Sequence, residues 1–273
     1  MAPAHAYSVR ARVARQAGAV SRVKMMQSVG GGVWPCCLRW VAICCPVMLS
    51  VDDDVQEDLM QHCMEEMKVI DISRALEPAV AVWPGDQPFE HTWTARIAHG
   101  STVNLSAIHL STHTGTHADA PLHFLEEGAA IDQVPLLQFI GPCLVIDTGS
   151  ATAITPELVA ANDQQRVPRL LFKTRHSQVA DTRWDPDLVP FLPAAIDRMG
   201  RQGVVLVGTD APSVDPADSK TLDAHKALAR HNIVNLENLL LKDVMPGSYR
   251  LVALPLKLPG LDAAPVRAVL FQE

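Results

Sequence analysis

The most informative segment of the sequence is residues 109–124, which read His109-Leu-Ser-Thr-His113-Thr-Gly115-Thr-His117-Ala-Asp119-Ala-Pro121-Leu-His123-Phe. Four histidines and one aspartate fall within 15 residues, although the whole chain of 273 residues has only 11 histidines. Such a density is improbable by chance. It indicates a site whose chemistry depends on imidazole and carboxylate groups.

The spacing of these side chains suits a metal ion. The odd-numbered members are His113, His117, Asp119 and His123. Residues of the same parity share one face of an extended strand, and a bend at Gly115 would let two imidazoles and a carboxylate converge. Pro121 would end regular strand pairing and aim His123 separately. Imidazole and carboxylate are ligands of zinc, manganese and iron, so we expect a metal site rather than a plain hydrogen-bonded histidine cluster.

Further ligands would have to come from later in the chain. The candidates are His176, His225, His231, Asp210, Asp215, Asp218, Asp223 and Glu237. Spacing alone does not choose between His225 and His231. Asp210 would either hydrogen-bond a ligand histidine or cap the turn that follows it. Ser111 and Ser213 lack a Gly-x-Ser-x-Gly setting, which argues against a serine nucleophile.

The rest of residues 67–273 alternates short apolar runs with helical stretches. We expect strands at 69–72, 144–147, 169–173, 204–208 and 250–254, and helices starting at Thr155-Pro156 and spanning 193–201 and 222–230. His91 and His99 flank an expected hairpin and are interpreted as surface residues. This alternation predicts an α/β fold in a single domain.

Residues 1–66 have a different character. They carry six basic groups before residue 52, seven acids from 52 to 66, and five of the six cysteines. The basic part is similar in composition to a mitochondrial transit peptide. The Cys36-Cys37 and Cys44-Cys45 pairs lack the two-residue gap that zinc sites use. We interpret 1–66 as an extension, disordered or belonging to a start codon assigned too early, without a catalytic role.

Composition excludes several classes of protein. The chain is 48% hydrophobic and 19% charged, as is usual for a globular protein. A net charge of −7 gives no general attraction for nucleic acid. The apolar run 40–51 is shorter than the roughly 20 residues that span a bilayer, so no membrane partner is expected. Cys143, alone in the body, fits a reducing cytoplasm.

The motif His113-Thr-Gly-Thr-His117-Ala-Asp119-Ala-Pro-Leu-His123 resembles that of the cyclase family of metal-dependent hydrolases, and within it the bacterial kynurenine formamidases (arylformamidases). Other matching segments are Trp83-Pro-Gly-Asp86, Gly208-Thr-Asp210-Ala-Pro-Ser213-Val-Asp215, Ser219-Lys-Thr-Leu-Asp-Ala-His225, and 254–270. The resemblance covers about 68–271. It implies a compact α/β domain of the swivelling β/β/α type, with a mixed, barrel-like sheet.

The resemblance also implies the site. It indicates two zinc ions per subunit, with manganese possible, held by His113, His117, Asp119, His225 and Glu237. Asp119 and Glu237 would bridge the ions, His123 would be the acid/base residue, and Trp83 would contact the substrate. His231 is then a surface residue at a helix end. No role is derived for Lys257, Asp262 or Arg267.

The implied reaction is zinc-dependent hydrolysis of N-formyl-L-kynurenine to L-kynurenine and formate in tryptophan degradation, by a cytoplasmic homodimer. Zinc can supply hydroxide at neutral pH and polarise the formyl oxygen, and an imidazole can protonate the leaving arylamine. Two alternatives remain open: another amide hydrolase of the family, similar to isatin hydrolase and using manganese, or a metal-binding scaffold without activity.

Overall fold

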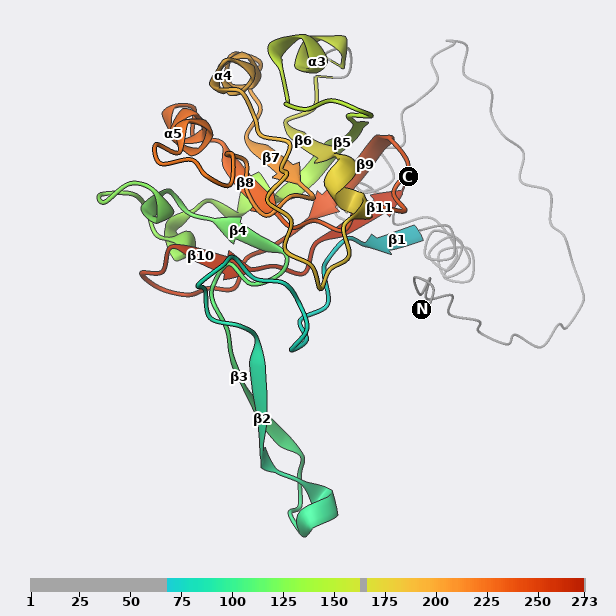
Figure 1. Ribbon diagram of the computed structural model, residues 1–273, viewed down its shortest axis with the longest axis vertical. Coiled ribbons are helices and arrows are strands. Elements are labelled where there is room, and N and C mark those ends of the chain that lie inside the picture. Colours follow the sequence, from blue (N-terminus) through green and yellow to red (C-terminus); the bar gives the residue numbers. More distant parts are fainter. Residues whose placement is uncertain (1–67, 163–165, 273) are drawn as a thin grey trace, which may run out of the picture. The chain divides into compact units, whose positions relative to one another are not determined.

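The described part of the chain is built on a mixed sheet of nine strands (Figure 1). The computed structural model describes residues 68–162 and 166–272, and the extension predicted for 1–66 lies outside them. The strands are β1 (Lys68–Asp71), β4 (His117–Asp119), β5 (Ile140–Asp147), β6 (Arg169–Lys173), β7 (Leu206–Thr209), β8 (Val234–Glu237), β9 (Gly247–Val252), β10 (Ala263–Pro265) and β11 (Val269–Gln272). Their order across the sheet is β1-β11-β9-β5-β6-β7-β8-β4-β10.

The centre of this sheet is parallel and its flanks are antiparallel. β5, β6, β7 and β8 run parallel, whereas β9 and β4 pair antiparallel with the outer members β5 and β8. The parallel strands are the apolar runs of the sequence, because strands covered on both faces need apolar side chains throughout. The strand predicted at 204–208 begins later, at Leu206. Val204 instead donates its N–H to Met199 at the end of the preceding helix.

Three helices cover one face of the sheet: α3 (Pro156–Ala161), α4 (Pro193–Arg201) and α5 (Asp223–Arg230). α4 has the bounds that the sequence predicts. Thr155 caps α3 as expected, since its side chain accepts a hydrogen bond from the N–H of Leu158 at 3.3 Å. Short 3-10 turns occupy Ile97–His99, Pro121–His123, Ile131–Gln133, Leu136–Phe139 and Arg175–Gln178.

Two apolar cores lie on opposite faces of the sheet. Leu144 and Ile146 of β5 pack with the three helices, whereas Cys143 and Val145 pack on the other side, against β9, β11 and the turns around Phe139. The strand alternation thus divides β5 between the two cores. The sheet curls around the second core (Figure 1), which confirms the expected mixed, barrel-like α/β architecture.

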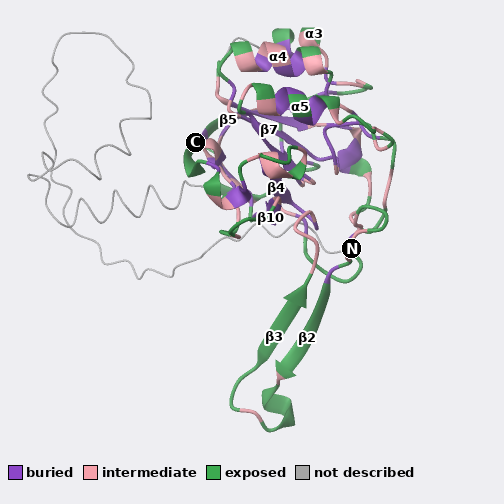
Figure 2. Ribbon diagram, turned by 90° about the vertical axis from the view of Figure 1, so that its left-hand side faces the viewer, coloured by how far each residue is buried: buried purple, intermediate pink, exposed green. Residues whose placement is uncertain are grey.

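A separate two-stranded sheet stands apart from both cores. β2 (Glu90–Ala95) and β3 (Leu105–His109) form an antiparallel hairpin that projects from the body, and almost all of it is exposed (Figure 2). His91 and His99 lie in this hairpin and are exposed, as predicted. Among the described residues, no helix has the length and apolarity needed to cross a membrane.

Candidate metal centre

Strand pairing brings the first three candidate ligands together. β4 lies between β8 and β10, and its His117 pairs with Glu237 of β8 while its Asp119 pairs with Ala263 of β10. Residues paired on neighbouring antiparallel strands have side chains on the same face. The His117 Nε2 atom is 3.5 Å from Glu237 Oε2 and 3.3 Å from Asp119 Oδ1. The register of a single pair of strands therefore sets the centre of the site.

His113 reaches this centre from a turn rather than from the strand. The extended strand predicted for the whole motif covers only His117–Asp119. Gly115 has φ +66, and a Cβ on it would lie 2.6 Å from Leu76 Cδ2, so only glycine fits this bend. The turn places His113 Nδ1 3.0 Å from Asp119 Oδ1. The bend predicted at Gly115 is confirmed, and it removes the need for parity along one long strand.

His225 enters from the first turn of α5, and Asp215 holds it there. The Asp215 carboxylate accepts the backbone N–H groups of Ala224 and His225 at 2.9 and 3.0 Å, and lies 2.6 Å from His225 Nδ1. The His225 Nε2 atom then faces Asp119 Oδ2 at 3.3 Å and Glu237 Oε1 at 3.5 Å. The structure thus brings His225, and not His231, to the cluster.

Each of the three buried imidazoles is anchored through its other ring nitrogen. Asp215 holds His225, the Gly115 carbonyl oxygen lies 2.9 Å from His117 Nδ1, and Asp262 Oδ2 lies 2.9 Å from His113 Nε2. Histidines that bind metals almost always donate their second N–H to a carboxylate or carbonyl in this way. The anchored nitrogens are the donors, which leaves the opposite nitrogens as lone pairs aimed at the carboxylates.

The two buried carboxylates each face two sides. Asp119 directs Oδ1 to His113 and His117 and Oδ2 to His225, while Glu237 directs Oε2 to His117 and Oε1 to His225. Asn235 donates through Nδ2 to Asp119 Oδ2 at 2.8 Å and to Glu237 Oε1 at 3.0 Å. Two acids this close, buried side by side, are costly unless positive charge lies between them.

The chemistry of the donor set fits a metal centre. His117 Nε2 and Asp119 Oδ1 are buried and have no hydrogen-bond partner among the described residues, although they lie 3.3 Å apart. Buried polar atoms are nearly always satisfied, so each exception needs an explanation. A cation between them would supply one. The ligand atoms of His113, His117 and Asp119 all lie within 4.8 Å of one another, as a common ion requires.

The electrostatics of the cluster also favour positive charge. Burial alone would lower the pKa of His117, but the carboxylates of Asp119 and Glu237 raise it to about 10. Burial likewise opposes protonation of His225, yet Asp119, Asp215 and Glu237 hold its pKa well above the usual value. Burial opposes ionisation of Asp119, and the facing histidines still hold its pKa well below the usual range. Without a metal, protons on the imidazoles neutralise the carboxylates.

His123 lies at the open side of the cluster. It comes from the turn Pro121–His123, so Pro121 ends β4 and aims this ring separately, as predicted. Its side chain is 33% exposed, and its Nδ1 lies 3.4 Å from the same Asp262 Oδ2 that anchors His113. The His113 and His123 ring centroids are 4.2 Å apart. His123 can therefore reach both the metal centre and a bound molecule.

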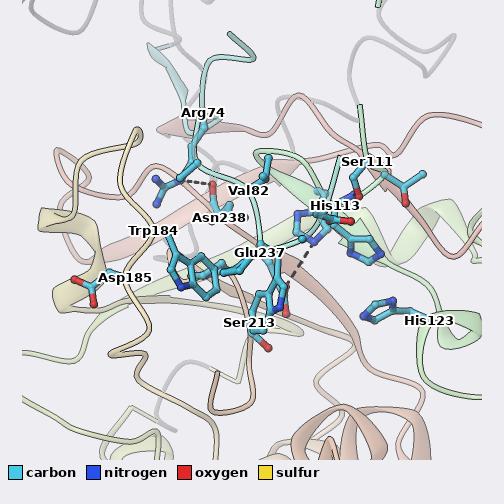
Figure 3. Close-up of a pocket in the computed structure, with 18 of the residues that line it drawn as sticks. Arg74, Val82, Ser111, His113, His123, Trp184, Asp185, Ser213, Glu237 and Asn238 are labelled. Atoms are coloured by element: carbon cyan, nitrogen blue, oxygen red, sulfur yellow. Dashed lines mark hydrogen bonds and ion pairs between the residues drawn. The ribbon is translucent and has the colours of Figure 1, made fainter. Parts of the chain in front are cut away.

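A cavity of about 580 Å³ opens over these residues. Figure 3 shows His113 and Glu237 at its middle, His123 on one side, and Trp184 and Asp185 on the other. Trp83 also lines it and meets Trp184 edge to face, with ring centroids 4.6 Å apart and an interplanar angle of 68°. Trp83 is therefore a pocket residue rather than a core tryptophan. Trp184 carried no signal in the sequence.

Other candidates have structural roles. His231 lies at the end of α5, with Nε2 2.9 Å from Asp197 of α4, which confirms its surface assignment. Asp210 neither contacts a ligand histidine nor caps its own turn among the described contacts; it accepts hydrogen bonds from Thr174 and Ser177 beyond β6.

The two serines and His176 lie in the pocket wall. The hydroxyls of Ser111 and Ser213 accept backbone N–H groups at 3.3 and 3.2 Å, as turn-forming serines do. His176 is buried, and burial lowers its pKa, so it is neutral near pH 7. It belongs to none of the metal-ligand clusters found among the described residues.

Sequence comparison places this geometry in a known family. The Cyclase family model matches residues 70–216. The chain belongs to the cyclase family. Among relatives of this cyclase-family member, a kynurenine formamidase from Salinibacter ruber is 53% identical over 206 residues, which are 75% of this chain and 97% of the relative.

Solved structures of the cyclase family share the fold. A potential metal-dependent hydrolase with cyclase activity has a TM-score of 0.67 and 33% identity, over 76% of this chain and 98% of the other. A metal-dependent hydrolase from Bacillus stearothermophilus has a TM-score of 0.65 and 33% identity, over 76% and 99%. Isatin hydrolase A from Labrenzia aggregata, at 23% identity and TM-score 0.67 over 80% and 99%, shares the fold. This cyclase-family member is thus a hydrolase, with the fold that the motif implied.

Proposed function

We propose that this cyclase-family hydrolase converts N-formyl-L-kynurenine to L-kynurenine and formate, in the degradation of tryptophan. The observation that carries the proposal is the pair Asp119 and Glu237, each with one oxygen toward His117 and the other toward His225. The formamidase relative supports this substrate over isatin, because the isatin hydrolase is similar only in fold.

The residues of the cluster are assigned to two zinc ions, with manganese as the other metal that this ligand set accepts. His113 and His117 would hold one ion and His225 the other, with Asp119 and Glu237 shared between them. When bound, the ions activate water near neutral pH and polarise the formyl oxygen. The buried, unpartnered His117 Nε2 and Asp119 Oδ1 support this assignment.

The other residues would hold the substrate and move its proton. Trp83 and Trp184 offer aromatic surfaces to the benzene ring of the substrate, and their edge-to-face contact fixes the angle between them. Hydrolysis adds the oxygen of water to the formyl carbon and breaks the bond from that carbon to the aryl nitrogen. His123 would give the nitrogen its proton as this bond breaks. Asp262, 3.4 Å from His123 Nδ1, would keep the ring turned toward the pocket.

The proposal extends to the assembly and location of the enzyme. A homodimer in the cytoplasm is proposed, with a small molecule as the substrate and neither nucleic acid nor a membrane as a partner. The acidic net charge of −7 and the free Cys143 support this setting. Residues 1–66 are proposed to be an extension outside the catalytic domain 67–273.

Substrate choice tests the proposal. The purified chain would be incubated with N-formyl-L-kynurenine or with isatin, and each product followed by its absorbance. We expect kynurenine to form, and isatin to be opened at a far lower kcat/KM. Preferential opening of isatin would favour the alternative activity. No hydrolysis of either compound by protein shown to contain metal would contradict both.

A further inference from the structure

The hairpin Glu90–His109 is not covered by any described part of the chain. Only Ala95 among the residues of its two strands is partly buried, and neither strand pairs with the nine-stranded sheet. Figure 2 shows it projecting from the body, exposed along its length. An isolated two-stranded hairpin is marginally stable in water at best. A hairpin that holds this shape therefore needs a partner surface.

One face of the hairpin has the character of an interface. The pairing of His91 with Ile108 and of Trp93 with Ser106 puts these side chains on the same face. Ile108 is 60% exposed and Trp93 47% exposed. Exposed apolar side chains grouped in this way mark sites of protein association, in which aromatic residues are enriched.

Charge selects a second copy of this chain as the partner. The 28 residues from His91 to Ala118 contain a single formal charge, Arg96, in a chain with a net charge of −7. The Arg96 guanidinium lies over the Trp93 ring, 4.9 Å from its centroid. Two acidic copies repel each other over most of their surfaces, and the repulsion is smallest where such an uncharged segment meets its equal.

The size of the hairpin also suits a stable dimer. Glu90 to His109 is 20 residues. A standard protein interface uses about 20–30 residues on each side and buries about 800 Å² per partner. A symmetric contact uses the same patch twice, so the arm supplies most of what each copy needs.

The hairpin also begins and ends at the mouth of the pocket. Asp86 lies four residues before Glu90, and Ser111 lies two residues after His109; both line the cavity. Four residues span about 14 Å at most. A molecule seated on the base of the arm therefore lies against the open side of the site.

We propose that the hairpin Glu90–His109 is an arm on which a second copy docks, and that this copy covers the mouth of the metal-centre pocket. The proposal rests on the homodimer put forward above and adds its contact surface and its consequence for the site. It does not depend on the substrate, so hydrolysis and docking can fail separately.

The experiment compares Ile108→Asp with Leu137→Asp in the full chain. Leu137 is the matched control, because it is 79% exposed and lies in a surface turn of the body, outside the hairpin. Molar mass would be measured by light scattering after size exclusion, and folding by the thermal transition. Wild type and Leu137→Asp should have the mass of a dimer, and Ile108→Asp that of a monomer. A dimeric Ile108→Asp, or a monomeric wild type, would overturn the proposal.

Hydrogen exchange on wild-type protein keeps the test independent of the variant's folding. Amides of residues 90–109, and of the mouth segments 83–86 and 111–113, should exchange slowly at high protein concentration and faster on dilution. Rapid exchange of the arm at every concentration would contradict docking. Protection of the arm without a concentration-dependent change at the mouth would contradict the covering of the pocket.

Discussion

Asp215 Oδ2 lies 2.6 Å from His225 Nδ1, and the same carboxylate accepts the N–H groups that begin α5. One side chain thus fixes both the helix start and the direction of the imidazole. The Nε2 atom of His225 has no freedom to turn away from Asp119 and Glu237. The position of the last ligand in the cluster follows from this contact.

Asp215→Asn should therefore loosen one metal more than the other. The amide cannot accept the ring N–H and the helix N–H groups as a carboxylate does, so zinc affinity should fall by about 10- to 100-fold at the weaker site. Isothermal titration with zinc measures this change. Asp197→Asn is the matched control, because Asp197 holds His231 in the same way at 2.9 Å on the surface. Equal zinc affinity in the two variants would contradict the role of Asp215.

Asp262→Asn should reduce turnover while the fold persists. Its Oδ2 atom contacts both His113 at 2.9 Å and His123 at 3.4 Å, so one carboxylate orients a ligand and the proton donor together. We expect kcat to fall by about 10- to 100-fold with a smaller change in KM. Steady-state kinetics at saturating zinc would show it. An unchanged kcat would mean that the two histidines keep their orientation without Asp262.

His123→Asn separates catalysis from metal binding. The proposed role of His123 is to protonate the leaving nitrogen, a contribution of about 10²- to 10⁴-fold. The variant should keep its zinc, measured by elemental analysis, and lose turnover by that factor. If its metal content collapses instead, His123 is a ligand. The clusters that include His123 with His113 and Asp262, or with Asp119 and His225, make that outcome a real test.

Metal binding should release protons near neutral pH. The carboxylates around His117 raise its pKa to about 10, so the metal-free site holds a proton there at pH 7.5 that an ion must displace. Calorimetric titrations in two buffers with different ionisation enthalpies count the released protons. We expect at least one proton per chain. A binding enthalpy that is the same in both buffers would contradict a protonated cluster.

The same shifts set the pH range over which the metal-free protein is stable. The raised pKa of His117 stabilises the fold fully below the unfolded value of about 6.5, and this stability is lost as pH rises through about 10. The lowered pKa values of Asp119 and Glu237 stabilise the fold above about 4, and this part is lost on acidification. Thermal unfolding after chelation should therefore weaken on both sides. Zinc should remove the alkaline loss.

The sequence predicted the ligands better than what surrounds them. The spacing of His113, His117 and Asp119 and the bend at Gly115 are local, so a motif carries them. Asp262 lies 139 residues from His123, and only the pairing of β10 with β4 brings it to the site. No local pattern encodes that register. Its place in the cluster could not be derived from the chain alone.

The same limit applies to the pocket wall and the hairpin. Trp184 has no motif around it, and its contact with Trp83 depends on two loops that meet across the cavity. The alternation of apolar and polar residues in 90–109 predicts strands but not whether a face is covered. Exposure is a property of the folded molecule, and it became visible only when both strands stood apart from the sheet.

Zinc-dependent recovery of activity tests the central claim most directly. The protein would be stripped with a chelator, zinc returned in measured equivalents, and kynurenine formation from N-formyl-L-kynurenine followed at each step. A site with two bridged ions predicts no activity without metal and full recovery at two zinc ions per chain. Activity that survives complete metal removal, or fully zinc-loaded protein that forms no kynurenine, would contradict the account.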